Sequence, residues 1–244
     1  MDSSDWFEHW FNTKYYHLLY EHRNEKEAQF FIDGLCRYLK WPKNSKLIDI
    51  ACGKGRHAIR LNKLGFDVTG VDLSQNNVKA ARKYENDLLR FYVHDMKKVF
   101  KPAYFDGVLN LFTSFGYFEH TDDNKLAISS MALNLKKGGY IVIDYLNNKP
   151  LLNNLEENRS CTRGSVDFKI EKRIEACYLI KEIVVRDGQK EQQFTERLHL
   201  YNLDDFTSFF MHSNLKIKHV FGNYALDNFD EDSSERIILI GERL

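Results

Sequence analysis

Short apolar runs alternate with helical patterns over roughly the first 145 residues of the chain. Helical periodicity, with apolar positions three and four residues apart, covers residues 25–39, the segment after residue 55, residues 75–87 and residues 122–135. Apolar or alternating runs typical of strands cover residues 47–51, 66–72, 89–94, 105–110 and 140–144. Strands that alternate with helices form parallel sheets whose faces are covered by those helices. We therefore expect an α/β fold.

The pattern changes after about residue 160. Two long β-type runs, 166–186 and 189–201, flank Asp187-Gly188, which is a strong hairpin turn signal. A helix over 203–213 and strands over 215–221 and 236–242 follow, with an acidic loop between the two strands. Along the second run, residues 195, 197, 199 and 201 share one strand face and residues 194, 196, 198 and 200 share the other. The more polar face, which carries Arg197 and His199, faces either the active site or solvent.

A glycine turn joins the first strand to the next helix. Leu47–Ala51 runs into Cys52-Gly53-Lys54-Gly55, and the helical pattern follows directly. Glycine lets a ligand approach the backbone closely, and the N–H groups and dipole of a helix N-terminus favour electron-rich groups. Asp72 ends the second strand about twenty residues later, where an acid can hydrogen-bond a ribose diol. The two features predict a nucleoside-binding βαβ unit.

Asp49 distinguishes between two classes of cofactor. Gly53-x-Gly55-x-x-Ala58 fits the loose dinucleotide pattern, which is weak by itself. A charge inside a buried strand costs several kcal/mol unless it is compensated. Asp49 would repel a pyrophosphate, whereas it would attract the ammonium and sulfonium of S-adenosylmethionine.

These residues resemble the class I S-adenosylmethionine-dependent methyltransferase family. Asp49 to Gly55 is similar to its D/E-x-G-x-G-x-G motif, with Ala51 in place of the first glycine, and Gly70 to Ser74 is similar to its second motif. The aromatic run 111–118 resembles the fourth motif of small-molecule N- and O-methyltransferases, especially bacterial sugar N-methyltransferases. The resemblance implies that S-adenosylmethionine is the cofactor and S-adenosylhomocysteine the product. It also implies a set of cofactor-binding residues in the core: Asp49, Ala51, Cys52, Gly53, Gly55, Asp72, Leu73, Asp95, Met96, Asn110 and Phe112.

The N-terminal segment is rich in aromatic residues and is expected to cap the core or to act as a lid. The spacing of Tyr15, Tyr20 and Arg23 is similar to that of N-terminal segments in small-molecule methyltransferases, where such residues approach the methionine carboxylate. The aromatic run 111–118 is either a wall of the acceptor pocket or a buried loop. The substrate-binding candidates are Ser114, Tyr117, Arg197 and Tyr201.

Methyl transfer by in-line displacement requires mainly alignment and exclusion of water. A general base is needed only if the nucleophile arrives protonated. Tyr117 and His199 are weak candidates for that role, as are His57 and His120, and no motif identifies the catalytic residue.

Composition narrows the range of partners. The formal net charge is 0 and the pI about 7.1, which argues against nucleic acid or an anionic membrane as a partner. The four cysteines show neither C-x-x-C nor metal-ligand spacing, so no metal is expected. No signal peptide or membrane-length apolar run is seen, and we expect a cytoplasmic protein.

Together these features predict a single methyltransferase domain with a Rossmann-like fold. Its mostly parallel seven-stranded sheet would have an antiparallel last strand, as in the family, plus an inserted antiparallel β-rich segment. The expected parts are an N-terminal cap (1–45), a cofactor-binding core (46–159), the insertion (160–201) and a C-terminal helix with a strand pair (202–244). The expected reaction is methyl transfer to an N or O of a small molecule. The alternatives are an RNA methyltransferase, an NAD(P)-binding oxidoreductase and a non-catalytic protein that binds S-adenosylmethionine.

Overall fold

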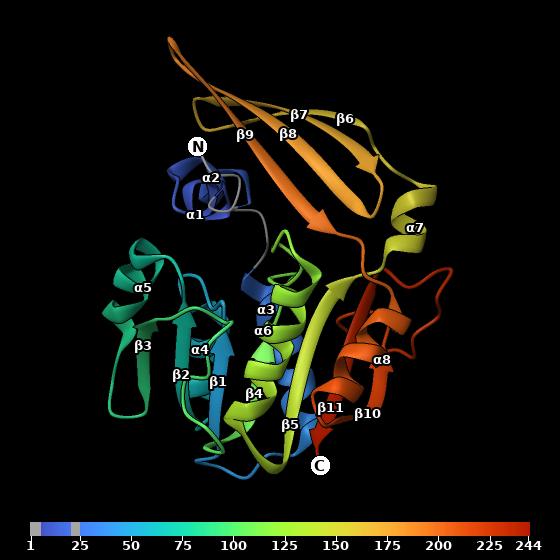
Figure 1. Ribbon diagram of the computed structural model, residues 1–244. Coiled ribbons are helices and arrows are strands. Elements are labelled where there is room, and N and C mark those ends of the chain that lie inside the picture. The colour runs from blue at the N-terminus through green and yellow to red at the C-terminus, as the bar shows by residue number, and fades with distance from the viewer. Residues whose placement is uncertain (1–5, 21–24) are drawn as a thin grey trace.

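The computed structural model describes residues 6–20 and 25–244 of the 244-residue chain. Two sheets dominate the molecule (Figure 1). A seven-stranded sheet with helices on both faces forms the larger part, and a four-stranded antiparallel sheet lies beyond one end of its strands. The α/β prediction is confirmed.

The seven-stranded sheet has the strand order β10-β11-β5-β4-β1-β2-β3. Only β11 runs antiparallel to its neighbours, β5 and β10, so the predicted antiparallel last strand is confirmed. The strand bounds are β1 (Lys46–Ile50), β2 (Asp67–Asp72), β3 (Leu89–Val93), β4 (Phe105–Asn110), β5 (Leu135–Leu146), β10 (Leu215–Phe221) and β11 (Arg236–Arg243). The insertion enters between β5 and β10, as expected.

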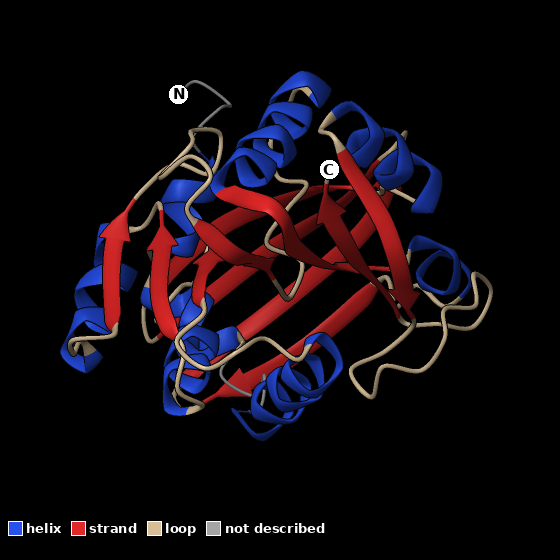
Figure 2. Ribbon diagram, turned by 90° about the horizontal axis from the view of Figure 1, so that it is seen from below, coloured by secondary structure: helices blue, strands red, loops and turns tan. Residues whose placement is uncertain are grey.

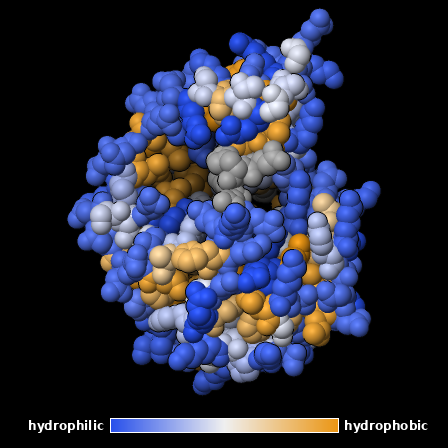
Figure 3. All heavy atoms as spheres, turned by 180° about the vertical axis from the view of Figure 1, so that it is seen from behind, coloured by the Kyte–Doolittle hydropathy of each residue, from blue (hydrophilic) through white to orange (hydrophobic). Residues whose placement is uncertain are grey.

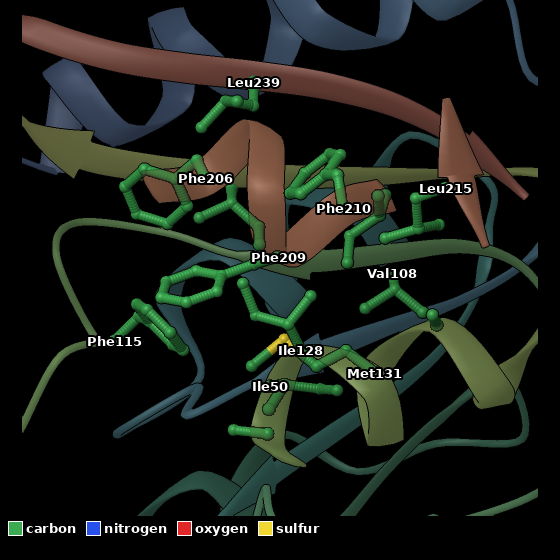
Figure 4. Packing of buried hydrophobic residues seen from close by; sticks show 14 of the residues in the cluster. Ile50, Val108, Phe115, Ile128, Met131, Phe206, Phe209, Phe210, Leu215 and Leu239 are labelled. Carbon is green, nitrogen blue, oxygen red and sulfur yellow. The ribbon is translucent and has the colours of Figure 1, made fainter. Parts of the chain in front are cut away.

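Helices cover both faces of this sheet (Figure 2). One face carries α3 (Glu25–Leu39), α4 (Arg56–Lys63) and α5 (Gln75–Ala81). The other carries α6 (Thr121–Asn134) and α8 (Leu203–His212), whose side chains pack with Phe115 and Leu239 (Figure 4). Strand β1 contributes to both cores, because Leu47 packs on the first side and Ile48 and Ile50 on the second.

The second sheet consists of β6 (Asn158–Arg163), β7 (Val166–Glu175), β8 (Tyr178–Asp187) and β9 (Lys190–His199), paired in chain order. A short helix, α7 (Asn148–Asn153), leads into it. The predicted hairpin at Asp187-Gly188 is confirmed. The β-type run predicted over 166–186 is confirmed, but it is divided into two strands by a turn at Ala176-Cys177, where Ala176 adopts a left-handed φ of 52°.

The N-terminal helices α1 (Trp6–Phe11) and α2 (Lys14–Leu19) pack against one face of the second sheet. Trp10, Tyr15 and Leu19 share a buried cluster with that sheet, in which the rings of Trp10 and Phe194 lie 4.6 Å apart between centroids. We call α1 and α2, together with Tyr20, the cap helices. They lie between the second sheet and the β2–α5 region of the first (Figure 1).

One predicted helix end and one predicted strand start are wrong. The helix predicted over 75–87 ends at Ala81 and continues only as a 3-10 turn, Arg82–Tyr84. α6 ends at Asn134, within one residue of the predicted end, but β5 begins at Leu135 instead of Tyr140, so Lys136 to Gly139 belong to the strand. Lys136 Nζ lies 2.7 Å from Asp106 Oδ1 on β4, so its charge serves the sheet rather than a helix C-terminus.

Candidate active site

A cavity of about 850 Å³ opens where β1, β2, β3 and β4 end, and the cap helices line its opposite side. Figure 3 shows the molecule hollowed in this way, with hydrophobic residues bordering the hollow. Ligands of open α/β sheets bind at the carboxyl ends of the strands, and this volume is large for a single small molecule. The cavity therefore has room for a cofactor and an acceptor together.

The glycine turn forms the floor of the cavity. Ala51, Gly53 and Gly55 adopt left-handed φ values of 59°, 56° and 84°, and the first two line the cavity with Cys52. Ala51 thus takes the conformation that a glycine would adopt at its position, at a strain cost of about 1 kcal/mol. Gly55 lies behind the wall as the N-cap of α4, where a Cβ would approach the Phe91 ring to 2.6 Å. Its role is to let the helix start close to the sheet.

Asp72 joins this turn to the end of β2. Its Oδ2 accepts from Gly53 N at 2.8 Å and its Oδ1 accepts from Ser74 N at 2.9 Å. Burial raises the pKa of Asp72, although these N–H groups oppose the shift. Asp72 and Leu73 line the cavity. The carboxylate is thus fixed by backbone groups and keeps an edge available to a ligand's hydroxyls.

Asp95 and Met96 line the same cavity beyond β3. Asp95 Oδ1 accepts from Lys97 N at 2.9 Å, which orients the carboxylate in a tight turn. Met96 also packs against the buried core of the α6 face. The acids at the ends of β2 and β3 therefore line the same cavity.

Asp49 lies behind the glycine turn rather than in the cavity wall. It is 1% exposed, and its Oδ2 has no hydrogen-bond partner among the described residues. Burial raises its pKa to about 7, against the opposing effect of the Ala58 N–H. Asn110 Oδ1 is also buried without a described partner, while its Nδ2 donates to Ile50 O at 3.0 Å. These oxygens create a negative potential beneath the turn that favours a cation above it.

Phe112 forms an aromatic wall after β4. Its ring stacks on His57 and on Tyr224, with centroids 4.9 and 4.8 Å apart, and the Arg56 guanidinium lies 4.1 Å from its centroid. Burial lowers the pKa of His57 well below its usual value, so the imidazole is neutral. Phe112, His57 and Arg56 all line the cavity, as do Ser114 and Tyr117 farther along the run. The run 111–118 is therefore a wall of the cavity.

Sequence reasoning missed the pair that holds this wall in place. Phe112 and Thr113 are consecutive residues with left-handed φ values of 58° and 57°. Asp144, fully buried at the end of β5, accepts from Phe112 N at 2.7 Å, and its backbone carbonyl accepts from Thr113 N at 3.0 Å. Arg236 donates to Asp144 Oδ1 at 2.8 Å and to Thr113 Oγ1 at 2.9 Å. A lone acid in the apolar run 141–145 was the available signal.

The three N-terminal residues predicted to bind the cofactor do not all lie at the cavity. Tyr20 lines the cavity, and its hydroxyl donates to Glu196 Oε1 at 2.8 Å. Tyr15 points away, and its hydroxyl donates to Asp187 Oδ2 at 3.1 Å. Arg23 lies outside the described residues. The cap helices contribute other cavity residues that were not predicted, among them Asn12, Tyr16 and His17.

The candidates on β9, Arg197 and His199, and Tyr201 just after it do not line the cavity. Arg197 stacks on the Tyr178 ring at 3.8 Å and lies 3.8 Å from Glu119 Oε1. Tyr201 packs into the α8 core, and His199 stacks on Tyr201 with centroids 4.7 Å apart. His120 is exposed as the residue before α6. Of the catalytic candidates, only Tyr117 and His57 line the cavity.

The residues present fit S-adenosylmethionine. An orphaned buried carboxylate lies beneath the turn, a backbone-held carboxylate ends β2, and the turn itself has no side chain larger than that of Cys52 between Ala51 and Gly53. In the described part of the chain, no three His, Cys, Asp or Glu side chains are grouped to hold a metal ion. None of the described helices has the length and apolar character that a membrane crossing needs.

Comparison with curated proteins shows local similarity to N-methyltransferases. The chain is 33% identical over 103 residues to dTDP-3-amino-3,4,6-trideoxy-alpha-D-glucopyranose N,N-dimethyltransferase from Streptomyces venezuelae, covering 42% of this chain and 43% of that protein. It is 34% identical over 135 residues to glycine/sarcosine N-methyltransferase from Parasynechococcus marenigrum, covering 53% and 46%. The chain thus spans less than half of the length of these relatives.

Solved structures share the whole architecture. A S-adenosylmethionine-dependent methyltransferase from Clostridium acetobutylicum aligns with a TM-score of 0.79 at 22% identity, covering 94% of this chain and 96% of that one. A sugar N-methyltransferase from Streptoalloteichus aligns with a TM-score of 0.72 at 22% identity, covering 93% and 92%. The family model described as a methyltransferase domain matches residues 42–198. The chain therefore belongs to the methyltransferase-domain family, and its resemblance to S-adenosylmethionine-dependent methyltransferases is confirmed.

Proposed function

We propose that this chain transfers a methyl group from S-adenosylmethionine to an amino nitrogen of a small-molecule acceptor. The observation that carries the proposal is one cavity with two different ends. Backbone-held acids after β2 and β3 line one end, and the aromatic residues Phe112 and Tyr117 line the other. Two relatives that methylate amino groups by name favour nitrogen over oxygen as the acceptor atom.

Each group at the cofactor end has an assigned role. Asp72 would hold the ribose hydroxyls, Asp95 and Met96 the adenine, and the backbone from Ala51 to Gly53 the methionine portion. The buried charge of Asp49 would favour the cationic cofactor electrostatically, without contact. When bound, S-adenosylmethionine supplies a methyl group on a sulfonium whose sulfur leaves as a neutral thioether in an in-line displacement.

The chain's own residues align the acceptor and exclude water. The aromatic wall at Phe112 is held rigid by Asp144, and the cap helices cover the opposite side. An amine must lose its proton before it attacks. Tyr117 and His57 are the candidate proton acceptors that touch the cavity, and His57 is neutral there. His199 lies behind the wall, so any role for it would be indirect.

The alternatives fit the site less well. The pyrophosphate of a dinucleotide would lie against the negative potential of Asp49 and Asn110. An RNA acceptor would need a basic surface that a chain of net charge 0 supplies only as a local patch. A protein that only binds the cofactor would not need the open volume beside the aromatic wall.

Calorimetric titration with S-adenosylmethionine, S-adenosylhomocysteine and NADH tests the cofactor. We expect micromolar affinity for the first two and none for NADH. Labelled methyl transfer to a panel of amino sugars, sugar nucleotides, amino acids and catechols then tests the acceptor atom. Turnover with amines but not catechols would support the proposal. NADH binding alone, or methylation of catechols alone, would contradict it.

A further inference from the structure

The cap helices face the cavity on one side and the second sheet on the other. Phe11, Tyr16, His17 and Tyr20 line the cavity, whereas Trp10 is 1% exposed among side chains of the second sheet. The cap helices therefore carry groups to the cavity, but their position depends on contacts made behind them.

One buried carboxylate is the centre of those contacts. Glu196 on β9 is 3% exposed, and its Oε1 accepts from Trp10 Nε1 at 2.7 Å and from Tyr20 Oη at 2.8 Å. Its Oε2 pairs with Lys181 Nζ on β8 at 2.8 Å. Lys181 Nζ also lies 3.3 Å from Tyr20 Oη. Trp10, in the first cap helix, and Tyr20, after the second, thus attach to the same residue.

Glu196 is suited to anchor its hydrogen-bond donors, and it is not suited to exchange a proton. Burial raises its pKa, but Lys181 and the hydrogen bonds from Trp10 and Tyr20 lower it by more, so the pKa lies below its usual value. The group is a carboxylate at neutral pH and accepts charge-assisted hydrogen bonds, which are the strong ones. Since its oxygens are used by these donors, it anchors the Tyr20 hydroxyl in one orientation.

The far side of the cap is attached to the first sheet. Ser74 Oγ, at the N-cap of α5 two residues after Asp72, donates to Asn12 Oδ1. Asn12 and Asp72 line the same cavity. The segment from Trp10 to Tyr20 therefore spans the gap from Glu196 to the end of β2.

We propose that Glu196, paired with Lys181, is a positioning residue of the cofactor site. The strands of the inserted sheet do not line the cavity, but through Glu196 the sheet sets where Tyr20 and the rest of the cap meet the cofactor. This rests on the proposed function, which places the cofactor in the cavity beneath the cap. A buried ion pair that served stability alone would leave the affinity for cofactor unchanged when it is neutralised.

The test compares Glu196→Gln with Trp10→Phe and with a control, Glu182→Gln. Glu182 lies on β8 and bonds only surface residues, Arg173 and Thr195, on the exposed face. Trp10→Phe removes one bond to Glu196 and replaces no residue of the cavity wall, while an aromatic ring is kept beside Tyr16, which lines the cavity. For each folded protein we would measure the affinity and dissociation rate of S-adenosylhomocysteine, the thermal midpoint, and hydrogen exchange over residues 9–20.

We expect Glu196→Gln to weaken S-adenosylhomocysteine binding at least tenfold, mainly through faster dissociation, with faster exchange in residues 9–20. Trp10→Phe should give a smaller loss in the same direction, and Glu182→Gln should match the wild type. If both test variants bind within twofold of wild type, the assignment is overturned, whatever their thermal midpoints. If Glu196→Gln does not fold, Trp10→Phe decides by the same criterion. A wild type that does not bind S-adenosylhomocysteine would overturn the proposed function as well.

Discussion

The two sheets of the molecule meet solvent and ligand in different ways. In the seven-stranded sheet, β1 is buried at four of its five positions and contributes side chains to cores on both faces. In the four-stranded sheet, the first six positions of β7 alternate between buried and exposed, because only one face is covered by the cap helices. The ends of the strands in the first sheet can therefore contact a ligand directly. In the second sheet, one face packs on the cap helices, and these helices contact the ligand.

The difference lies in how each sheet reaches the cavity. Acids and backbone groups at the ends of β1, β2 and β3 enter the cavity directly and are fixed by the parallel sheet. No residue of β6 to β9 lines the cavity in the part of the chain that the structure describes. The second sheet acts through Tyr20 and its neighbours, so its influence passes through hydrogen bonds to the cap.

Asp144→Ala should have the largest effect on stability, because Asp144 holds the aromatic wall at Phe112 in place at the end of β5. It removes the acceptor for Phe112 N and takes the buried carboxylate away from Arg236, which is only 17% exposed and keeps its bond to Thr113 Oγ1. We expect a loss of about 3–5 kcal/mol in the free energy of unfolding. Urea unfolding measures it. Asp106→Ala, which breaks a half-exposed pair with Lys136, is the control and should cost about 1 kcal/mol or less. Equal losses in the two variants would contradict a special role for Asp144.

Asp72→Ala tests whether the strand ends of the first sheet bind cofactor. It removes a carboxylate that lines the cavity, and charged hydrogen bonds of this kind contribute about 1.5–3 kcal/mol, or roughly 10–100-fold in affinity. Calorimetry with S-adenosylhomocysteine measures the loss. Asp67→Ala, at the other end of β2, is a matched control that should bind normally. Unchanged affinity in Asp72→Ala would place the ribose elsewhere.

Asp49→Asn tests the buried charge through pH. The pKa of Asp49 is raised to about 7 in the folded protein, above its unfolded value near 4. The folded state therefore holds a proton that the unfolded state has lost, so this carboxyl makes stability fall as pH rises from about 4 to about 7. Between pH 5 and pH 8 the free energy of unfolding of the wild type should fall by about 1 kcal/mol or more, in excess of any fall in Asp49→Asn. Urea unfolding at the two pH values measures this difference. Parallel pH profiles would show that Asp49 is not perturbed.

The same residue should make cofactor binding depend on pH. The ionised form favours a cation, so the preference for S-adenosylmethionine over S-adenosylhomocysteine, whose sulfur is neutral, should rise as pH passes about 7. The Asp49→Asn variant should show no such rise. Competition binding at pH 6 and pH 8 measures the ratio.

Arg197→Ala should have the smallest effect. Arg197 neighbours Glu196 but lies on the other face of β9, stacked on Tyr178 at the surface. Exposed ion pairs and cation–π contacts contribute about 1 kcal/mol or less. We expect unchanged affinity for S-adenosylhomocysteine and a small change in thermal midpoint. A tenfold loss of affinity would mean that both faces of β9 act on the site.

The structural elements that could be predicted from sequence are those determined by residues close to them in the chain. The glycine turn and the Asp187-Gly188 hairpin each depend on residues within a few positions, and α3 begins and ends where its apolar period does. The turn at Ala176-Cys177 lacks glycine, proline and asparagine, so the tertiary pairing of β7 with β8 determines it.

The parts that sequence did not predict depend on distant partners. Asp144 and Arg236 are 92 positions apart and meet only because β11 pairs with β5. Glu196 had been assigned to the less polar face of its strand without a role, since nothing local indicates that Trp10 and Tyr20 will reach it. The cavity residues at the ends of β1, β2 and β3 could be proposed from sequence because the family motifs mark strand ends.

The bond between Trp10 and Glu196 also has a consequence for biosynthesis, because its two residues are 186 positions apart. A ribosome releases the cap helices first and β9 much later, at about 5–20 residues per second. During that interval the aromatic side chains of the cap have no sheet to pack against. The aromatic side chains of the cap are therefore exposed to solvent on the nascent chain for about ten seconds or more. We expect a chaperone that binds exposed apolar segments to bind this segment.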